Sequence, residues 1–176
     1  STVARYKAKE SLSDYAIYNL GADTGTMFLA INLNNRKNDK GKYYVSSIKQ
    51  QWFSDINFRT AIDYAIDRNS LVTNIAQGLA VPLFTSESLN GIYLNKNIKG
   101  HKRDLKLAEQ YLAKSGFSKH SDGLLYDRKG HKVEFDLYTN AGNTERESIG
   151  VMLKQDLSDL GMTVNFKPVE FNTLVN

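Results

Sequence analysis

The C-terminal part of the chain constrains the fold most, because a strand pattern, a long helix pattern and a second strand pattern follow one another there. Residues 133–138 alternate apolar and polar side chains, the period of a half-buried strand. After a polar loop, TNAGNTERE, a helix pattern runs to about Leu160 and ends at Gly161. Met162, Val164 and Phe166 then alternate again. A strand, a helix of about 25 Å and a strand predict a right-handed crossover between parallel strands. The fold class is therefore α/β, with helices packed on a mixed sheet.

The long helix carries its own start signal and a continuous apolar stripe. Thr144 and Glu147 have the spacing of a capping box, in which each side chain satisfies a backbone N–H at the helix start. The apolar side chains at helical spacing are Ile149, Leu153, Leu157 and Leu160. We expect this stripe to face the core.

Two further strands are expected near the N-terminus. Tyr15–Gly21 and Thr24–Asn34 have strand composition and are separated by a turn over residues 21–25. The second is apolar at consecutive positions from Met27 to Ile31, which predicts a central strand covered on both faces.

The middle of the chain predicts helices and one long loop. Asp55 or Asn57 can cap a helix over Phe58–Ile66. A second short helix follows Asp67 and stops at Gly78, and Asp104 can cap a third that ends at Gly116. Between the last two, about 20 residues after Pro82 lack periodicity, and loops of that length are usually functional. Residues 124–139 read as a hairpin whose turn is at 127–130.

Composition excludes several classes of protein. At 41% hydrophobic and 24% charged residues, the 176-residue chain has the composition of one globular domain. The 23 bases and 19 acids are spread along it, and no basic stripe interleaved with aromatics indicates nucleic-acid binding. Without cysteine, disulfides and thiolate chemistry are excluded. No apolar run approaches the roughly 18 residues of a membrane span, and the N-terminus lacks a signal-peptide pattern. The chain is thus expected to be cytoplasmic or a piece of something longer.

Motifs for catalysis are absent from the sequence. His101, His120 and His131 have neither a second ligand at helical spacing nor a cysteine partner, so no metal site is indicated. The G-x-S-x-G, phosphate-loop and dinucleotide-binding glycine patterns do not occur. The charges in AIDYAIDR are those of the solvated side of an amphipathic helix.

The loop Tyr138–Glu147 is the strongest candidate site. It follows the C-terminal end of a strand and opens a helix, the place where open α/β sheets bind ligands and where a helix N-terminus attracts anions. Asn140 and Asn143 supply amides, and Arg146 can bind a carboxylate with two hydrogen bonds. A purely structural interpretation stays open: Asn143 or Thr144 caps, Gly142 turns the chain, and Arg146 is solvated.

The order of the motifs resembles the bacterial extracellular solute-binding proteins of family 5, the dipeptide, oligopeptide and nickel receptors of ABC importers. YNLGADTGTMFLAINLN resembles the family's strand ending in Phe-Asn or Leu-Asn, and FRTAIDYAIDRNSLVTNIAQGLAVP its Tyr-Ala-Ile-Asp-Arg helices. DLKLAEQYLAKSGF is similar to its Asp-Pro-x-x-Ala segment, with Leu105 in place of the usual proline. DLYTNAGNTERE and DLGMTVNF are similar to its Thr-Asn-x-Gly-Asn loop and its final strand.

The resemblance implies a two-lobed binding protein with a type II periplasmic-binding-protein fold. Residues 1–176 would form a single domain, most of the C-terminal lobe (domain III), with 35–53 as a surface insertion. The protein would bind peptides without catalysis or a cofactor, and a membrane permease would be its partner. It would be periplasmic or extracytoplasmic, or a membrane-anchored lipoprotein.

The same resemblance divides the residues into scaffold and site. The two short helices of residues 58–78 would be scaffold, with Arg59 and Arg68 in salt bridges. Their exit loop, about Val81–Asn90, would face the cleft. The expected ligand-binding residues are Tyr138, Asn140, Gly142, Asn143, Arg146, Phe84 and Thr85.

Three alternatives remain open. One is a receptor of this family for an oligosaccharide, a nickel complex or haem. Another is a small α/β enzyme acting on an anionic substrate at Asn143–Arg146. The last is an interaction domain using residues 35–53, where Tyr43, Tyr44, Trp52 and Phe53 gather, although Trp52 and Phe53 are also suited to the core.

Overall fold

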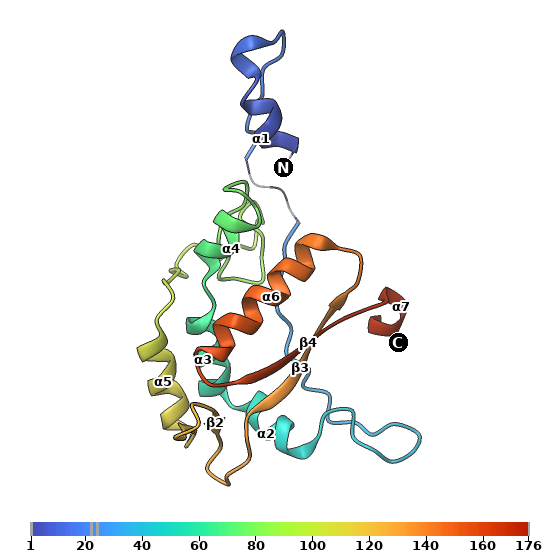
Figure 1. Ribbon diagram of the computed structural model, residues 1–176, viewed down its shortest axis with the longest axis vertical. Helices are drawn as coiled ribbons and strands as arrows, with labels where there is room; N and C mark the ends of the chain where they lie inside the picture. Colours follow the sequence, from blue (N-terminus) through green and yellow to red (C-terminus); the bar gives the residue numbers. More distant parts are fainter. Residues whose placement is uncertain (1, 22, 24, 176) are drawn as a thin grey trace. The chain divides into compact units, whose positions relative to one another are not determined.

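The computed structural model describes residues 2–21, 23 and 25–175 (Figure 1). The chain divides into two compact units. One comprises Ser1–Phe28 and Arg68–Gly100, and the other comprises Leu29–Asp67 and His101–Asn176. The first contains helix α1 (Thr2–Lys7), the 3-10 helix η1 (Glu10–Leu12) and helix α4 (Arg68–Asn74).

The larger unit contains the predicted α/β crossover. Strand β3 (Glu134–Asn140), helix α6 (Thr144–Ser158) and strand β4 (Thr163–Val169) follow one another, and β3 pairs with β4 in parallel. The short strands β1 (Ser118–Lys119) and β2 (Leu125–Tyr126) form a separate antiparallel pair. The prediction of an α/β fold with a parallel crossover is therefore confirmed, and the two kinds of strand pairing occur in separate small sheets.

Helix α6 ends where a glycine makes a left-handed turn that no other residue fits. Gly161 has φ +83°, and a Cβ there would lie 2.7 Å from the carbonyl oxygen of Gly123 and 2.9 Å from the backbone nitrogen of Leu125. The Leu125 N–H donates to the carbonyl of Gly161 at 2.8 Å. The helix stop thus also holds β2 beside the start of β4.

The β3–β4 sheet has one apolar and one polar face. Phe135 and Leu137 pair in register with Val164 and Phe166, so all four point to one side. That side packs against α6, where Gly150 lies under the ring of Phe166. The other side carries charged and polar residues that bond to one another: Glu134, Asp136, Tyr138, Asn165 and Lys167.

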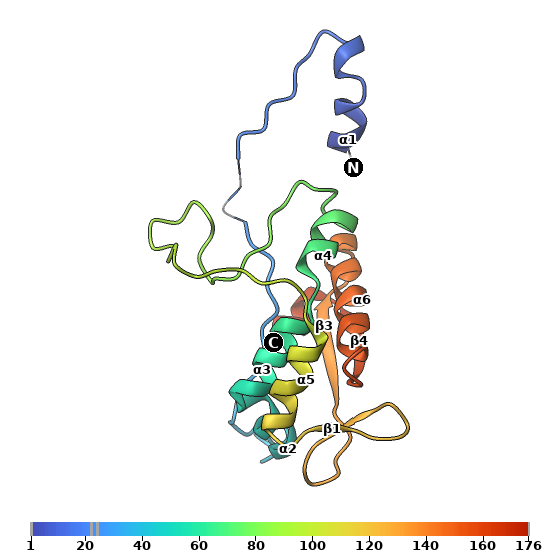
Figure 2. The same ribbon diagram turned by 90° about the vertical axis from the view of Figure 1, so that its left-hand side faces the viewer.

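Helices α2 (Ser47–Ser54), α3 (Ile56–Ala65) and α5 (Leu105–Lys114) complete the core of this unit. In Figure 2, α3 and α5 lie side by side, and they pack against each other. Phe58 is fully buried in α3, and its ring contacts those of Phe53 and Phe117. Phe53 also meets Phe135 of β3 edge to face, which joins the helices to the sheet.

Several predicted caps are confirmed. The carboxylate of Asp55 accepts from the backbone N–H groups of Asn57 and Phe58 at the start of α3, and that of Asp104 accepts from Leu107 at the start of α5. In the predicted hairpin turn, the Gly130 N–H donates to the carbonyl of Asp127 at 2.9 Å. The buried stripe of α6 is confirmed for Leu153, Leu157 and Leu160, while Ile149 is half-buried.

Two predicted strands are wrong. Among the described residues of 15–21 and 24–34 there is no strand, and the side chain of Phe28 is 84% exposed. A central strand requires a partner on each edge, and the described residues offer none to this segment. The residues Ala22 and Thr24 of the predicted turn lie outside the described residues.

The segment 35–53, expected to be a surface insertion, is exposed in its first half and helical in its second. Residues 36–44 are an exposed loop, and α2 begins at Ser47. Trp52 of α2 is 5% exposed, and its indole Nε1 donates to Asp127 at 2.9 Å. The interpretation of Trp52 as a core residue is therefore confirmed. No helix among the described residues is long and apolar enough to cross a membrane.

Candidate functional site

The candidate site is the loop that connects the end of β3 to the start of α6. Backbone pairing with β4 continues one residue past the strand, because the Ala141 N–H donates to the carbonyl of Val169 at 2.7 Å. Gly142 follows with φ +83°, a backbone conformation that favours glycine. The loop is thus held at both ends and turns at a single residue.

Helix α6 is capped by Asn143, whose side-chain oxygen accepts from the backbone N–H of Arg146 at 2.9 Å. The Glu147 carboxylate reaches back to the Gly142 N–H at 2.8 Å. The predicted capping box of Thr144 and Glu147 is therefore wrong by one residue. The reason is that an asparagine is at least as good an N-cap as a threonine, and the asparagine comes first in the chain.

The acids of the first turn change what the start of α6 can bind. Glu145 and Glu147 lie within the first turn, where they stabilise the positive end of the helix dipole. The Arg146 N–H is bonded to Asn143 and the Gly142 N–H to Glu147, so two backbone donors at this end of the helix are already used. Because the two carboxylates repel an added anion, a cationic side chain is needed to favour a negatively charged ligand here.

Arg146 supplies that positive charge. One guanidinium nitrogen of Arg146 donates to the side-chain oxygen of Asn140 at 2.8 Å, and Arg146 is exposed. Within the described part of the chain, no carboxylate lies within ion-pair distance of it. The guanidinium is therefore held by a neutral amide, and its other N–H groups and the Asn140 amide nitrogen can bond to a ligand.

Tyr138 lies on the polar face of the sheet, one step before Asn140 on the same side. Its hydroxyl donates to Asp136 at 3.0 Å, and this bond raises the pKa of Tyr138 above its usual value. Burial pushes the pKa of Asp136 upward, but hydrogen bonds from Lys167 and Tyr138 outweigh it and lower that pKa. The phenol stays neutral with its proton engaged, so Tyr138 offers a ligand chiefly the face of its ring.

The expected site residues are therefore divided among the end of β3, the connecting loop and the first turn of α6. Hydrogen bonds join Arg146 to Asn140 and to Asn143, whereas Tyr138 bonds to Asp136 instead. The sequence did not indicate Asp136 and Lys167, which bond to each other at 3.0 Å and orient Tyr138. The signal that could have found them is the parallel register, because Tyr138 pairs with Lys167 and lies two residues from Asp136.

Phe84 and Thr85, the other two expected ligand-binding residues, belong to the other compact unit. The guanidinium of Arg68 lies 4.8 Å from the centre of the Phe84 ring. The hydroxyl of Thr85 donates to the carbonyl of Glu87 at 2.7 Å. Their part in a ligand site remains a prediction. Arg59, expected in a salt bridge, donates to the backbone carbonyl of Phe53 at 2.7 Å.

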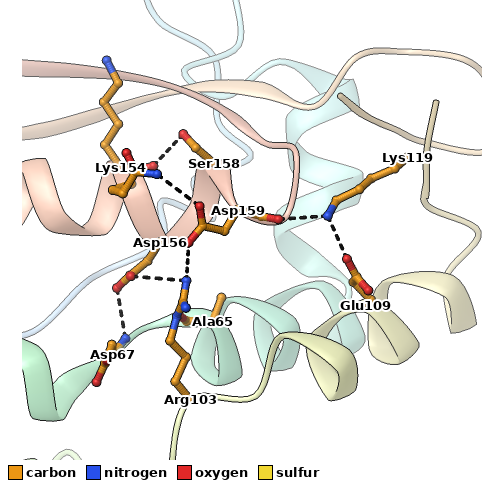
Figure 3. Close-up of polar contacts among 10 residues, drawn as sticks. Ala65, Asp67, Arg103, Glu109, Lys119, Lys154, Asp156, Ser158 and Asp159 are labelled. Atoms are coloured by element: carbon orange, nitrogen blue, oxygen red, sulfur yellow. Dashed lines mark hydrogen bonds and ion pairs between the residues drawn. The ribbon is translucent and has the colours of Figure 1, made fainter. Parts of the chain in front are cut away.

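A separate cluster of charges holds α6 to the end of α3 (Figure 3). The Nε of Arg103 donates to the carbonyl of Ala65 at 2.8 Å, and its guanidinium lies 2.5 Å from a carboxylate oxygen of Asp159 and 3.6 Å from one of Asp156. Asp156 also accepts from the backbone N–H of Asp67 at 3.0 Å. These groups bond to one another, so we assign the cluster a structural role.

Comparison with known proteins identifies the family to which the chain is similar. Residues 1–176 match the model of the bacterial extracellular solute-binding proteins, family 5 Middle. The chain is 35% identical over 130 residues to the oligopeptide-binding protein AppA of Bacillus subtilis. This match covers 72% of the present chain and 24% of AppA. The chain is 28% identical over 160 residues to a probable ABC transporter-binding protein of Deinococcus radiodurans, covering 90% of this chain and 25% of that protein. The chain therefore spans about a quarter of the length of these curated relatives.

Solved structures show the same likeness. AppA of Bacillus subtilis in complex with a nonapeptide superposes with a TM-score of 0.65 at 35% identity, over 72% of this chain and 26% of that one. NikZ of Campylobacter jejuni in complex with Ni(L-His) gives a TM-score of 0.65 at 25% identity, over 70% of this chain and 24% of that one. These neighbours are type II periplasmic binding proteins, and family members are substrate-binding transport proteins. The chain belongs to family 5 of the bacterial extracellular solute-binding proteins.

Proposed function

We propose that this chain is most of the C-terminal lobe (domain III) of the substrate-binding component of a bacterial ABC importer. The whole protein binds di- or oligopeptides in a cleft between two lobes and delivers them to a membrane permease. It acts outside the cytoplasm, in the periplasm or anchored to the membrane as a lipoprotein, and it catalyses no reaction.

The observation that carries the peptide assignment is the 35% identity to AppA, whose solved structure holds a nonapeptide. A second structure of the family, the oligopeptide-binding protein of Thermus thermophilus with a pentapeptide, is 29% identical over 70% of this chain. These likenesses concern the chain as a whole, so the role of individual residues between β3 and α6 rests on their own geometry.

That geometry suits a ligand with a carboxylate and amide groups. Arg146 is exposed and bonded to the neutral Asn140, so a ligand carboxylate could take a charge-assisted bond without displacing another acid. The Asn140 amide nitrogen can donate to a peptide carbonyl at the end of β3. Closure of a second lobe would then exclude water and strengthen these bonds.

A nickel complex is the main alternative solute. The chain is 30% identical over 64% of its length to the nickel-binding protein NikA of Staphylococcus aureus. The three histidines have separate partners in this structure: His101 contacts Asp63, His131 contacts Asp127, and His120 stacks on Tyr126. A nickel ion that arrives already bound by a small chelator would not need these histidines. Binding measurements with such a complex therefore distinguish a nickel receptor from a peptide receptor. An oligosaccharide or haem is tested in the same way.

An enzyme acting on an anionic substrate is the alternative from another class. It requires a group at Asn143–Arg146 that can transfer a proton or attack the substrate. Two carboxylates lie in the first turn of α6: Glu147 is bonded to the Gly142 N–H, and Glu145 is exposed. Neither is paired with a neighbouring base or nucleophile in the described residues, and Asn140, Asn143 and Arg146 supply amides and a guanidinium. These groups favour binding over catalysis.

The test is a calorimetric titration of the full-length protein with a series of peptides from two to nine residues, alongside Ni(II) with histidine, an oligosaccharide and haem. We expect heat and a raised melting temperature with at least one peptide length. A response confined to the nickel complex, the sugar or haem would overturn the peptide assignment. Conversion of any added solute to a product would overturn the non-catalytic assignment.

A further inference from the structure

The exposed loop Arg36–Tyr44, here called the basic loop, carries a local excess of positive charge. It contains four of the 23 basic residues and one of the 19 acidic ones, so its net charge is +3 against +4 for the whole chain. Residues 1–9 and 96–103 also carry a net positive charge, and acidic residues elsewhere balance most of the total, so the basic loop is one local concentration of positive charge in the chain. Such a concentration attracts anionic partners more strongly than a uniform distribution does.

The basic loop has a defined conformation of its own. The side-chain oxygen of Asn38 accepts from the backbone N–H groups of Lys40 and Lys42 at 3.1 and 3.0 Å. The Asn38 N–H donates to the carbonyl of Lys42, and the Tyr44 N–H donates to that of Arg36. Gly41, with φ +74°, makes the turn. The cations are therefore presented by an ordered hairpin.

Its base is fixed in the core. Val45, the next residue, is 7% exposed, and the Ser46 hydroxyl caps α2, whose Trp52 is buried. Figure 1 shows the loop standing out to the right of α2. Arg36, Lys37, Lys40 and Lys42 are all exposed, and none has an acidic partner within the described residues.

Two exposed tyrosines stand beside these cations. The side chains of Tyr43 and Tyr44 are 48% and 60% exposed, and the ammonium of Lys37 lies 4.7 Å from the centre of the Tyr43 ring. Tyrosine combines an apolar ring with a polar tip and is enriched where protein meets the headgroup region of a bilayer. Lysine, a flexible point charge, suits a diffuse field of phosphates.

We propose that the basic loop docks on the surface of a membrane that contains anionic phospholipids. Its cations would lie among the lipid phosphates, and Tyr43 and Tyr44 would enter the headgroup layer. The inference does not depend on which solute the protein binds, because the loop is separate from the β3–α6 loop in the sequence and in its contacts.

A protein partner fits this surface less well. A stable protein interface buries about 800 Å² and about 20–30 residues on each side, whereas the basic loop has nine residues. Recognition of individual carboxylates also favours arginine, since its planar group makes two bonds at once, and three of the four cations are lysines. An extended anionic surface requires neither a large area nor a fixed geometry.

The test measures co-sedimentation of the full-length protein, without lipid modification, with vesicles of phosphatidylcholine containing about 30 mol% phosphatidylglycerol or none. We expect binding to the anionic vesicles only. Binding should fall as NaCl rises from about 0.1 M to about 1 M, because the screening length shrinks from about 10 Å to about 3 Å. Each cation near such a surface contributes roughly five-fold to partitioning. The triple variant Lys37→Ser, Lys40→Ser and Lys42→Ser should thus bind on the order of a hundred-fold less.

A matched variant separates the loop from overall charge. Lys102→Ser, Lys106→Ser and Lys154→Ser removes the same charge from exposed positions of α6 and the α5 region, and it should keep most of the vesicle binding. Equal losses in both triple variants would overturn the proposal. Equal binding to both kinds of vesicle would also overturn it. The same holds if the protein bound the isolated permease through the basic loop and bound neither kind of vesicle. Solute affinity measured in parallel should be the same for both triple variants.

Discussion

The carboxylate of Asp156, on helix α6, accepts a hydrogen bond of 3.0 Å from the backbone N–H of Asp67, which lies just past the end of α3. The two residues are 89 positions apart in the sequence. Asp156 is the one buried charged residue in the described part of the chain, and burial raises its pKa despite the opposing effects of the Asp67 bond and of Arg103. A buried acid is therefore retained at the point where α6 meets the end of α3.

Replacing Asp156 should separate the value of its hydrogen bond from that of its charge. In Asp156→Ala the Asp67 N–H loses its partner, and we expect a loss of about 1–3 kcal/mol in the free energy of unfolding. In Asp156→Asn an amide oxygen can still accept that bond without a buried charge, so the loss should be smaller, about 1 kcal/mol or less. Urea unfolding of both variants measures the difference.

The exposed neighbour Asp159 provides the control. It binds the same guanidinium of Arg103 but is 36% exposed at its side chain. Asp159→Ala should cost under about 1 kcal/mol, as is usual for a surface ion pair. If Asp159→Ala proved as costly as Asp156→Ala, the ion pair with Arg103 rather than the Asp67 N–H would hold α6 to α3.

Gly150 should resist the substitution that normally stabilises helices. Alanine is favoured over glycine in a helix by up to about 1 kcal/mol. At Gly150, however, an added Cβ would overlap the ring of Phe166, and overpacking costs about 1–3 kcal/mol. We therefore expect Gly150→Ala to destabilise the chain, as measured by chemical unfolding.

A second substitution tests that explanation. Phe166→Leu alone should be destabilising, because it removes ring contacts between β4 and α6. Combined with Gly150→Ala it should cost less than the sum of the two single changes, since the smaller side chain makes room for the Cβ. Strict additivity would show that the Phe166 ring is not what excludes a side chain at position 150.

The crossover could be predicted from the sequence because each of its parts has a local signal. Gly161 ends α6 through its left-handed backbone, and the stripe at Leu153, Leu157 and Leu160 follows the helical period. The caps at Asp55 and Asp104 depend on two or three neighbouring residues only. Signals of this kind depend on residues that are close together in the sequence, so they can be recognised from the sequence alone.

The failures involved partners distant in the sequence or competition between adjacent residues. The apolar run Met27–Ile31 has strand composition, but whether it pairs depends on edges that composition does not reveal. Asn143 and Thr144 can both act as the N-cap of α6, and the choice of Asn143 sets where the helix begins. The bond between Arg146 and Asn140 could not be read from spacing, because it spans the turn at Gly142.

Asp127 should make the stability of the chain sensitive to acid. Burial alone would raise its pKa, but hydrogen bonds from Trp52, from both the backbone and the ring of His131, and from the Lys129 N–H outweigh burial and hold the pKa well below the usual 3.8. The unfolded chain therefore binds a proton at higher pH than the folded chain does. The stabilisation is complete above about pH 5 and is lost as pH falls below about 4 toward the folded pKa.

The measurement is urea unfolding between about pH 6 and about pH 2, followed by the fluorescence of Trp52, the one tryptophan of the chain. Asp127→Asn should be less stable near pH 6, and its deficit should shrink as the pH falls, because the parent loses the same charge. Asp39→Asn, at an exposed position, should follow the parent at every pH. A deficit that stayed constant down to about pH 2 would show that the charge of Asp127 contributes nothing.

Arg146 provides the direct test of the candidate site. Because its guanidinium is exposed and held by the neutral Asn140, a ligand carboxylate would gain a charge-assisted bond worth about 1.5–3 kcal/mol. Arg146→Gln in the full-length protein should then weaken the binding of a free peptide by about 10- to 100-fold. It should hardly change the affinity for the same peptide with an amidated C-terminus.

The control is Lys154→Gln, which removes a cation from an exposed position farther along the same helix. It should leave calorimetric affinities for both peptides unchanged. Asn140→Ala should weaken binding of the free peptide by less than Arg146→Gln does. Without Asn140 the Arg146 side chain is no longer held in place, and ordering it on binding costs conformational entropy. If Arg146→Gln weakened the free and amidated peptides equally, the residue would not contact the terminal carboxylate. If it weakened neither, the structural interpretation of the loop, in which Asn143 caps and Arg146 is solvated, would be correct.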